Sequence, residues 1–322
     1  MTASQSPPAP AGTSAPSPTS RRGRRRRATA LAPRDKLVLG LMLGIPSAVH
    51  IALVWLPALG SVGLSFSSWD GIGGFADIEW VGFRNYVDIF TRYPRFWPAL
   101  QHNLVWLLFL LVVPTVAGLL LAVLLDRQLR FGRIYQSALY LPMVLSLALV
   151  GFIWQLIYQP EQGLLNNVLG IAASDPVNWL GDPDINLYAV LVAAGWRHTG
   201  YIMLLYLAGL KSVDPALKEA GALDGANAWQ TFFRVTFPVL KPVNVVVLVV
   251  SVIEGLRAFD IVYVINKGRN GLELLSVLVT DNIIGESSRI GWGSALAVVL
   301  LLISLGFIVT YLLQVFREED RT

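Results

Sequence analysis

The chain contains six apolar stretches, each long enough to cross a lipid bilayer, which takes about 20 helical residues. They lie near residues 37–64, 103–125, 136–158, 187–210, 243–265 and 293–316. A segment that crosses hydrocarbon must satisfy its backbone N–H and C=O groups internally, and an α-helix does this within one segment. The sequence therefore predicts an all-α polytopic membrane protein with six transmembrane helices.

Composition supports this class of protein. Apolar residues make up 54% of the 322 residues and charged residues only 14%, which is typical of a polytopic membrane protein. The sequence has no cysteine, so it excludes disulfides and thiolate metal sites. Its three histidines are scattered along the chain, and we expect no metal site.

The distribution of Lys and Arg predicts the orientation of the spans. With the N-terminus inside, the inner segments carry about 17 of these residues and the outer segments about six, while two lie within spans. Basic residues favour the cytoplasmic side of a membrane. Both termini are therefore predicted to be cytoplasmic, with a six-span domain over residues 37–316 and a short C-terminal segment over 317–322.

Residues 1–36 form a region of different composition. The first 20 residues are mostly Pro, Ala, Ser and Thr, and the string RRGRRRR follows at 21–27. Such a segment cannot bury enough apolar surface to offset its chain entropy, so we expect a disordered cytoplasmic tail. Nucleic-acid binding and twin-arginine export are alternatives for the arginine run, but contact with anionic lipid is favoured beside a membrane span.

The longest inner insert, residues 211–242, lies between the fourth and fifth predicted spans. Asp214 followed by Pro215 predicts a helix start, because the carboxylate can accept from free first-turn amides and proline fits the first helical position. A helix is expected to run from Pro215 to about Leu223.

A turn and a second helix are expected to follow. Asp224 and Gly225 predict the turn, because glycine adopts the required backbone conformation and aspartate can cap the next helix. That helix should begin near 226–228 and stop at Phe237-Pro238. A structured loop with ordinary caps is one interpretation. The second interpretation is a docking element for another protein. It is favoured because the two helices are compact, rich in aromatic residues and expected to be exposed to water.

The sequence lacks the motifs of an enzyme. Residues 209–212 read Gly-Leu-Lys-Ser, but they lack the glycine before the lysine and the upstream glycine of a phosphate-binding loop. No nucleophile elbow or metal-binding helix is present either. If ATP drives this protein, we expect a separate chain to bind and hydrolyse it.

Charged side chains inside membrane spans are costly, so they are candidates for a transport pathway. The candidates are Arg197 in the fourth predicted span and Glu254, Arg257, Phe259, Asp260 and Tyr263 in the fifth. On a continuous helix, Arg257 would be within reach of either carboxylate. The charges could neutralise one another, within the helix or between Arg197 and Glu254. Alternatively, they could line a water-filled cavity that holds a polar, uncharged ligand.

Several strings together resemble the permeases of bacterial binding-protein-dependent ABC importers. In the inner insert, Glu219-Ala220-Gly221 followed by Asp224-Gly225-Ala226 is similar to the EAA loop of that family. Residues 81–86 (VGFRNY), 140–142 (YLP) and 257–260 (RAFD) resemble its sugar branch, and in particular the first permease of a maltose-type pair.

The resemblance implies a six-span subunit in the bacterial plasma membrane that pairs with a second permease. Two cytoplasmic ATPase subunits, which hold ATP and Mg²⁺, would dock on the two EAA loops. An extracytoplasmic binding protein would deliver a sugar. By the same resemblance Glu219 would contact the ATPase and Gly225 would form the turn of the coupling element.

The sequence departs from the family pattern in three places. Gly221 replaces the last alanine of the EAA motif, which should weaken the helix by up to about 1 kcal/mol. Phe237 stands where leucine is usual, and residues 266–271 replace the usual turn after the fifth span. Because of the last departure, the family pattern does not define the shape of that outer loop.

The sequence leaves three alternative functions open. The same machinery could carry another polar solute, such as glycerol phosphate, a polyamine or an oligopeptide, although a phosphate ester would call for several convergent basic groups. A secondary carrier could use Glu254 or Asp260 as a proton relay, but no internal repeat of the kind common in such carriers is evident. A receptor or scaffold would leave the charges within the spans unexplained.

Overall fold

The computed structural model describes residues 32–319 apart from 128, 173 and 286–287. Most of the predicted N-terminal tail and the last three residues lie outside the described residues. The chain divides after Leu56 into two compact units. The first unit contains α1 (Pro33–His50) and the π-helical turn η1 (Ile51–Trp55).

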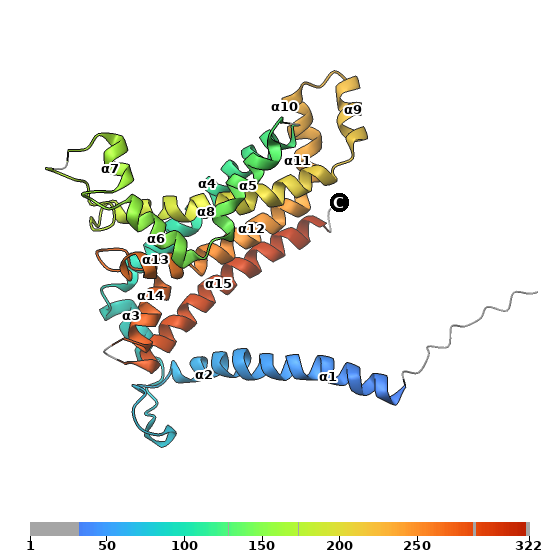
Figure 1. Ribbon diagram of the computed structural model, residues 1–322. Helices are drawn as coiled ribbons and strands as arrows, with labels where there is room; N and C mark the ends of the chain where they lie inside the picture. The colour runs from blue at the N-terminus through green and yellow to red at the C-terminus, as the bar shows by residue number, and fades with distance from the viewer. Residues whose placement is uncertain (1–31, 128, 173, 286–287, 320–322) are drawn as a thin grey trace, which may run out of the picture. The chain divides into compact units, whose positions relative to one another are not determined.

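The second unit begins at Pro57, within α2 (Leu56–Leu64), and the regular structure of its described residues is helical (Figure 1). Among the described residues, extended pairing is limited to one isolated bridge between Ser67 and Trp80. The all-α prediction is therefore confirmed. The other elements are η2 (Phe75–Asp77), α3 (Arg84–Arg92), α4 (Phe96–Asp126), α5 (Gly132–Val144), α6 (Leu147–Ile157), α7 (Leu164–Leu169), α8 (Asn186–Ser212), α9 (Pro215–Leu223), α10 (Ala228–Thr231), η3 (Phe232–Thr236), α11 (Phe237–Val239), α12 (Lys241–Leu256), α13 (Asp260–Asn266), α14 (Leu275–Ile283) and α15 (Ile290–Glu319).

Three helical segments of the described chain are long and apolar enough to cross a membrane: 33–64, α4 and the 290–311 part of α15. A fourth span results if α5 and α6 are counted together. The predicted number of six is not reached on these criteria. α8 has 27 residues but includes Arg197 and His198 at its middle, and α12 has only 16 residues. The six-span count therefore stays a prediction.

The third predicted span is not one continuous helix. α5 and α6 meet at an angle of 102°. Ser146 lies at the break and caps α6, because its hydroxyl oxygen accepts a hydrogen bond from the Leu149 N–H at 3.2 Å. The expectation of a single helix over 136–158 was wrong, since a helix start is encoded inside the apolar run.

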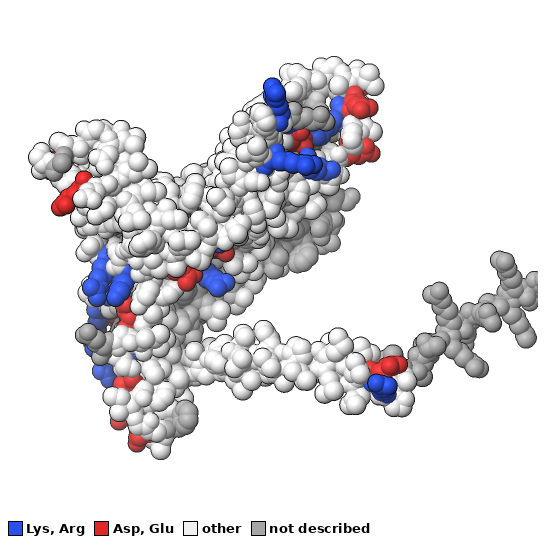
Figure 2. All heavy atoms as spheres, in the orientation of Figure 1, with Lys and Arg blue, Asp and Glu red and all other residues white. Residues whose placement is uncertain are grey.

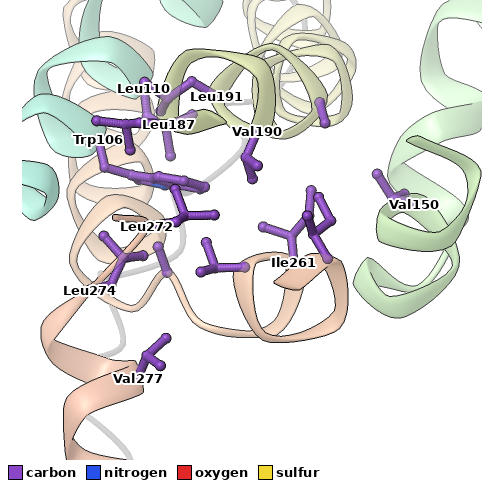
Figure 3. Close-up of a cluster of buried hydrophobic side chains, with 14 residues drawn as sticks. Trp106, Leu110, Val150, Leu187, Val190, Leu191, Ile261, Leu272, Leu274 and Val277 are labelled. Carbon is purple, nitrogen blue, oxygen red and sulfur yellow. The ribbon is translucent and has the colours of Figure 1, made fainter. Parts of the chain in front are cut away.

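Two long helices, α4 and α8, form the centre of the second unit and lie side by side (Figure 1). Figure 3 shows how one buried cluster joins them to the shorter helices: Trp106 and Leu110 from α4 lie against Leu187 and Leu191 from α8, and Ile261 of α13 lies near Val190. A second cluster follows the same pair of helices toward α12 and includes Ile202, Met203 and Val247.

α8 and α5 approach each other closely at Gly200. A Cβ atom on Gly200 would overlap the carbonyl oxygen of Leu139 and would lie 3.4 Å from the Cα of Tyr140. The neighbouring atoms belong to the backbone, so they cannot rotate away as a side chain could. The packing of α5 on α8 therefore requires a residue without a side chain at this position.

Residues 81–86, the string VGFRNY, have a structural role in this unit. The side-chain amide of Asn85 is buried and donates hydrogen bonds to the carbonyl oxygens of Ser65 and Ser67, at 2.9 and 2.7 Å. The hydroxyls of Tyr86 and Ser65 lie 2.6 Å apart. Asn85 thus fixes α3 against the chain that follows α2.

Candidate functional site

The first candidate site is the predicted docking element, residues 211–242. Its first helix, α9, begins and ends as predicted. The carboxylate of Asp214 accepts a hydrogen bond from the Ala216 N–H at 2.9 Å, and Pro215 occupies the first turn. Gly225 has φ of +79°, a conformation that side chains disfavour, so glycine is needed for the turn.

The second half of the element differs from the prediction. The cap of α10 is Asn227, not Asp224. The Asn227 side chain accepts from the Gln230 N–H at 2.8 Å, and the Gln230 side chain accepts from the Asn227 N–H at 3.0 Å.

Phe237-Pro238 does not end this helical segment. The chain continues from α10 through the π-helical turn η3 into α11, and Leu240 ends it. The Phe237 N–H bonds back to the Phe232 carbonyl, five residues earlier. A π-turn shifts the hydrogen-bond register, and the helical path accommodates Pro238 immediately after it.

The six predicted coupling residues lie on α9 and its following turn. Glu219, Ala220, Asp224 and Gly225 are exposed, while Gly221 and Ala226 are half-buried. Two large apolar side chains nearby are also open to solvent, with Leu223 89% and Trp229 71% exposed. The element therefore exposes both acidic and large apolar side chains to solvent, and exposed apolar groups of this kind are suited to contact with another protein.

An ion pair ties α9 to the end of α4. The Lys218 ammonium lies 3.2 Å from the Asp126 carboxylate, and both side chains are partly exposed. Sequence reasoning missed this contact because 92 residues separate the partners. The pair links α9 to α4, the longest helix of the described unit.

The second candidate site lies at a break in the fifth predicted span. α12 ends at Leu256 and α13 begins at Asp260, so residues 257–259 are not helical. The hydroxyl of Ser276 on α14 donates a hydrogen bond to the Ala258 carbonyl within this break. Irregular backbone within a membrane span is tolerated where it is buried or lines a cavity. Here Ala258 is buried, and Arg257 and Phe259 line a cavity.

A cavity of about 240 Å³ opens beside the break. Five of the six predicted pathway residues line it: Arg197, Glu254, Arg257, Phe259 and Asp260. Tyr263 does not line it but stacks on Phe259, with 4.9 Å between ring centroids and 24° between ring planes. The structure thus brings α8 and the α12–α13 break together around charged and aromatic side chains.

The expected ion pairs among these charges do not form in the described part of the chain. No N–O distance of 4.0 Å or less joins Arg197 or Arg257 to Glu254 or Asp260. The pairing of Arg257 with Glu254 or Asp260 was predicted from the spacing on a continuous helix, but α12 ends before Arg257. The buried Nε of Arg197 has no hydrogen-bond partner within the described residues.

Sequence reasoning also missed three polar residues that hold this region together. His198 Nε2 lies 3.0 Å from the hydroxyl of Ser251, and both side chains are buried between α8 and α12. Gln155 of α6 donates to the carbonyls of Val264 and Ile265 at 3.0 and 2.7 Å. Each of the three is a polar residue inside an apolar run, and this is the signal by which the sequence could have identified them.

A family comparison decides the class of protein. Residues 114–318 match the family described as "Binding-protein-dependent transport system inner membrane component". The chain belongs to this family. As a member, it is an integral membrane permease of an ABC transporter and is not the ATP-hydrolysing subunit.

Relatives of known name support the assignment over nearly the whole permease. The xylose/arabinose import permease XacH of Haloferax volcanii is 33% identical, with 85% of this chain and 87% of that protein covered. The trehalose/maltose permease MalF of Thermococcus litoralis is 30% identical over 85% and 92% of the two chains. The osmoprotective-compound permease GgtC of Synechocystis is 34% identical over 84% and 95%.

Solved structures share the fold. A chain from a bacterial ABC transporter that imports the acidic polysaccharide alginate matches with a TM-score of 0.75 and 22% identity, covering 88% of this permease and 96% of that chain. The match covers more of the chain than residues 114–318 and therefore includes part of the region before α4. Membership in this family also removes the secondary-carrier and receptor alternatives.

Proposed function

We propose that this permease forms, with a second permease, the membrane pathway of an ATP-driven importer for a sugar or oligosaccharide. The observation that carries the proposal is the set of relatives named for xylose and arabinose, for trehalose and maltose, and for arabinooligosaccharides, each at least 30% identical. An extracytoplasmic binding protein would deliver the substrate. A related alginate transporter was solved together with its substrate-bound periplasmic protein.

The exposed surface of α9 supports docking of an ATPase subunit. Glu219 and the apolar side chains of Leu223 and Trp229 would meet that partner, and Gly225 would form the turn between the two contact helices. Two such ATPases, holding ATP and Mg²⁺, would serve the two permeases. Both termini and the 211–242 element would then lie in the cytoplasm, in agreement with the Lys and Arg count.

The charge balance of the cavity favours an uncharged substrate over an ionic one. Arg197 and Arg257 are matched in number by Glu254 and Asp260. A phosphate ester would need an excess of basic groups and a polyamine an excess of acidic ones. Sugar hydroxyls can both donate and accept hydrogen bonds, so they suit a cavity with both kinds of charged group.

A deletion experiment tests the proposed substrate class. We expect a host strain lacking this permease to lose uptake of at least one radiolabelled sugar among maltose, trehalose, xylose, arabinose and arabinotriose, and to regain it with the intact gene. Uptake of glycerol 3-phosphate and spermidine should stay at the parental rate. Loss of either of these, with all the sugars unaffected, would contradict the proposal.

Replacement of Glu254 by alanine tests the pathway. A hydrogen bond to a charged group contributes about 1.5–3 kcal/mol, so we expect uptake to fall about tenfold or more. Co-purification of the partner subunits should be unchanged. Asp175→Ala removes an exposed carboxylate outside the cavity and should leave uptake intact. Normal uptake by the Glu254→Ala variant would exclude the cavity from the pathway.

A further inference from the structure

A large basic cavity lies at the end of α4, away from the pathway. It has a volume of about 630 Å³ and lies among the last turn of α4, the first turn of α5 and the end of α8. Four basic residues line it: Arg127, Arg130, Arg133 and Lys211. Figure 2 shows Lys and Arg gathered at one end of the second unit, the end that carries α9 and α10.

Within the part of the chain that the structure describes, the positive charge of this cavity is not neutralised by ion pairs. Of the described residues that line it, Asp126 is the only acidic one, and its carboxylate already pairs with Lys218 at 3.2 Å. None of the four lining cations makes an ion pair with another described residue. The Arg130 guanidinium instead lies 5.6 Å from the centroid of the Phe131 ring. An anionic ligand is therefore the natural counterpart of this cavity.

Exposed apolar side chains alternate with the arginines. Phe131 is 54% exposed, Ile134 65% and Tyr135 52%. Together with the cations they lie where the apolar α4 span ends, which is the level of the lipid headgroups. A site for a soluble anion has no need of exposed apolar neighbours. A phospholipid offers both a phosphate for the arginines and an acyl chain for the apolar side chains.

We propose that this cavity binds the headgroup of an anionic phospholipid. Arg130 and Arg133 donate hydrogen bonds to the phosphate, and Arg127 and Lys211, which also line the cavity, add electrostatic attraction. Phe131 and Ile134 lie along the first part of the acyl chains. Because Asp126 lines the cavity and pairs with Lys218, the bound lipid lies next to the contact that positions α9.

The test measures lipid binding to the full-length permease purified in detergent with its co-purifying subunits. Phosphatidylglycerol and phosphatidylcholine are titrated separately, and bound lipid is counted by native mass spectrometry. We expect phosphatidylglycerol to bind preferentially. An arginine near an anionic lipid surface contributes about fivefold in affinity, so Arg130→Gln/Arg133→Gln should weaken binding about 25-fold. The control Arg84→Gln/Arg269→Gln removes the same charge from exposed outer segments and should bind normally.

Four results would overturn the proposal. Equal binding of the two lipids would remove the role of headgroup charge, and equal weakening in both double variants would remove the role of this cavity. Displacement of the lipid by excess inorganic phosphate would assign the site to a soluble anion. Unchanged lipid binding with loss of the ATPase subunit in Arg130→Gln/Arg133→Gln would assign the surface to a protein partner.

Discussion

Replacement of Gly225 by valine is expected to abolish uptake while the permease still reaches the membrane. Gly225 has φ of +79° and no atom within 4 Å of the position of a Cβ. The cost is therefore conformational rather than steric: an L-residue in this region is disfavoured by about 1–2 kcal/mol, and a β-branched residue by more. Valine would change the turn and displace α10 from α9.

Two matched variants give this prediction its control. Gly225→Asn should retain much of the uptake, because asparagine tolerates positive φ better than most residues. Gly221→Ala should retain full uptake, since its Cβ would lie no closer than 3.6 Å to Thr231 and would favour the helix. Uptake should be measured together with membrane abundance. Loss of uptake in Gly221→Ala, with none in Gly225→Val, would contradict the assigned role of the turn.

Glu219→Lys tests the docking surface in the same element. Glu219 is exposed and has no ion-pair partner in the described chain, so charge reversal should leave folding unchanged. We expect the ATPase subunit to dissociate from the permease or to lose stimulation by the loaded binding protein. Normal coupling in both Glu219→Lys and Gly225→Val would exclude α9 as the docking element.

Gly200→Val is expected to reduce sharply the amount of folded permease. Inserting methyl groups into a packed core usually costs about 1–3 kcal/mol, and here the first added atom meets the backbone of α5. The yield of monodisperse protein and its thermal midpoint, measured by size-exclusion chromatography after heating, should both fall. Gly306→Val is the control, because no atom lies within 4 Å of its Cβ position. Equal yields from the two variants would contradict this account of the α5–α8 contact.

Local signals in the sequence were sufficient for much of the docking element. Asp214 and Pro215 mark the start of α9, and Gly225 marks its turn, because each effect involves neighbouring residues. The capping pair Asn227 and Gln230 is an equally local signal. Asp224, three residues before Asn227, offers a competing cap.

The breaks in the membrane segments were harder to predict. Neither glycine nor proline occurs at residues 257–259, and the bond from Ser276 that supports the break comes from a different helix. Hydropathy averages over such a break, so the fifth segment read as one span. Contacts across the fold, such as Lys218 with Asp126 or His198 with Ser251, depend on packing that no local pattern records.

The link between α9 and α4 also bears on motion. A partly exposed ion pair such as Lys218–Asp126 contributes no more than about 1 kcal/mol, which is close to the thermal energy of about 0.6 kcal/mol. The ion pair therefore favours one position of α9 but restrains the helix only weakly. In the proposed importer, a partner bound to α9 would therefore change the orientation of this helix during each cycle at a small cost in free energy from the ion pair. Raised salt would screen the two charges and weaken the ion pair further.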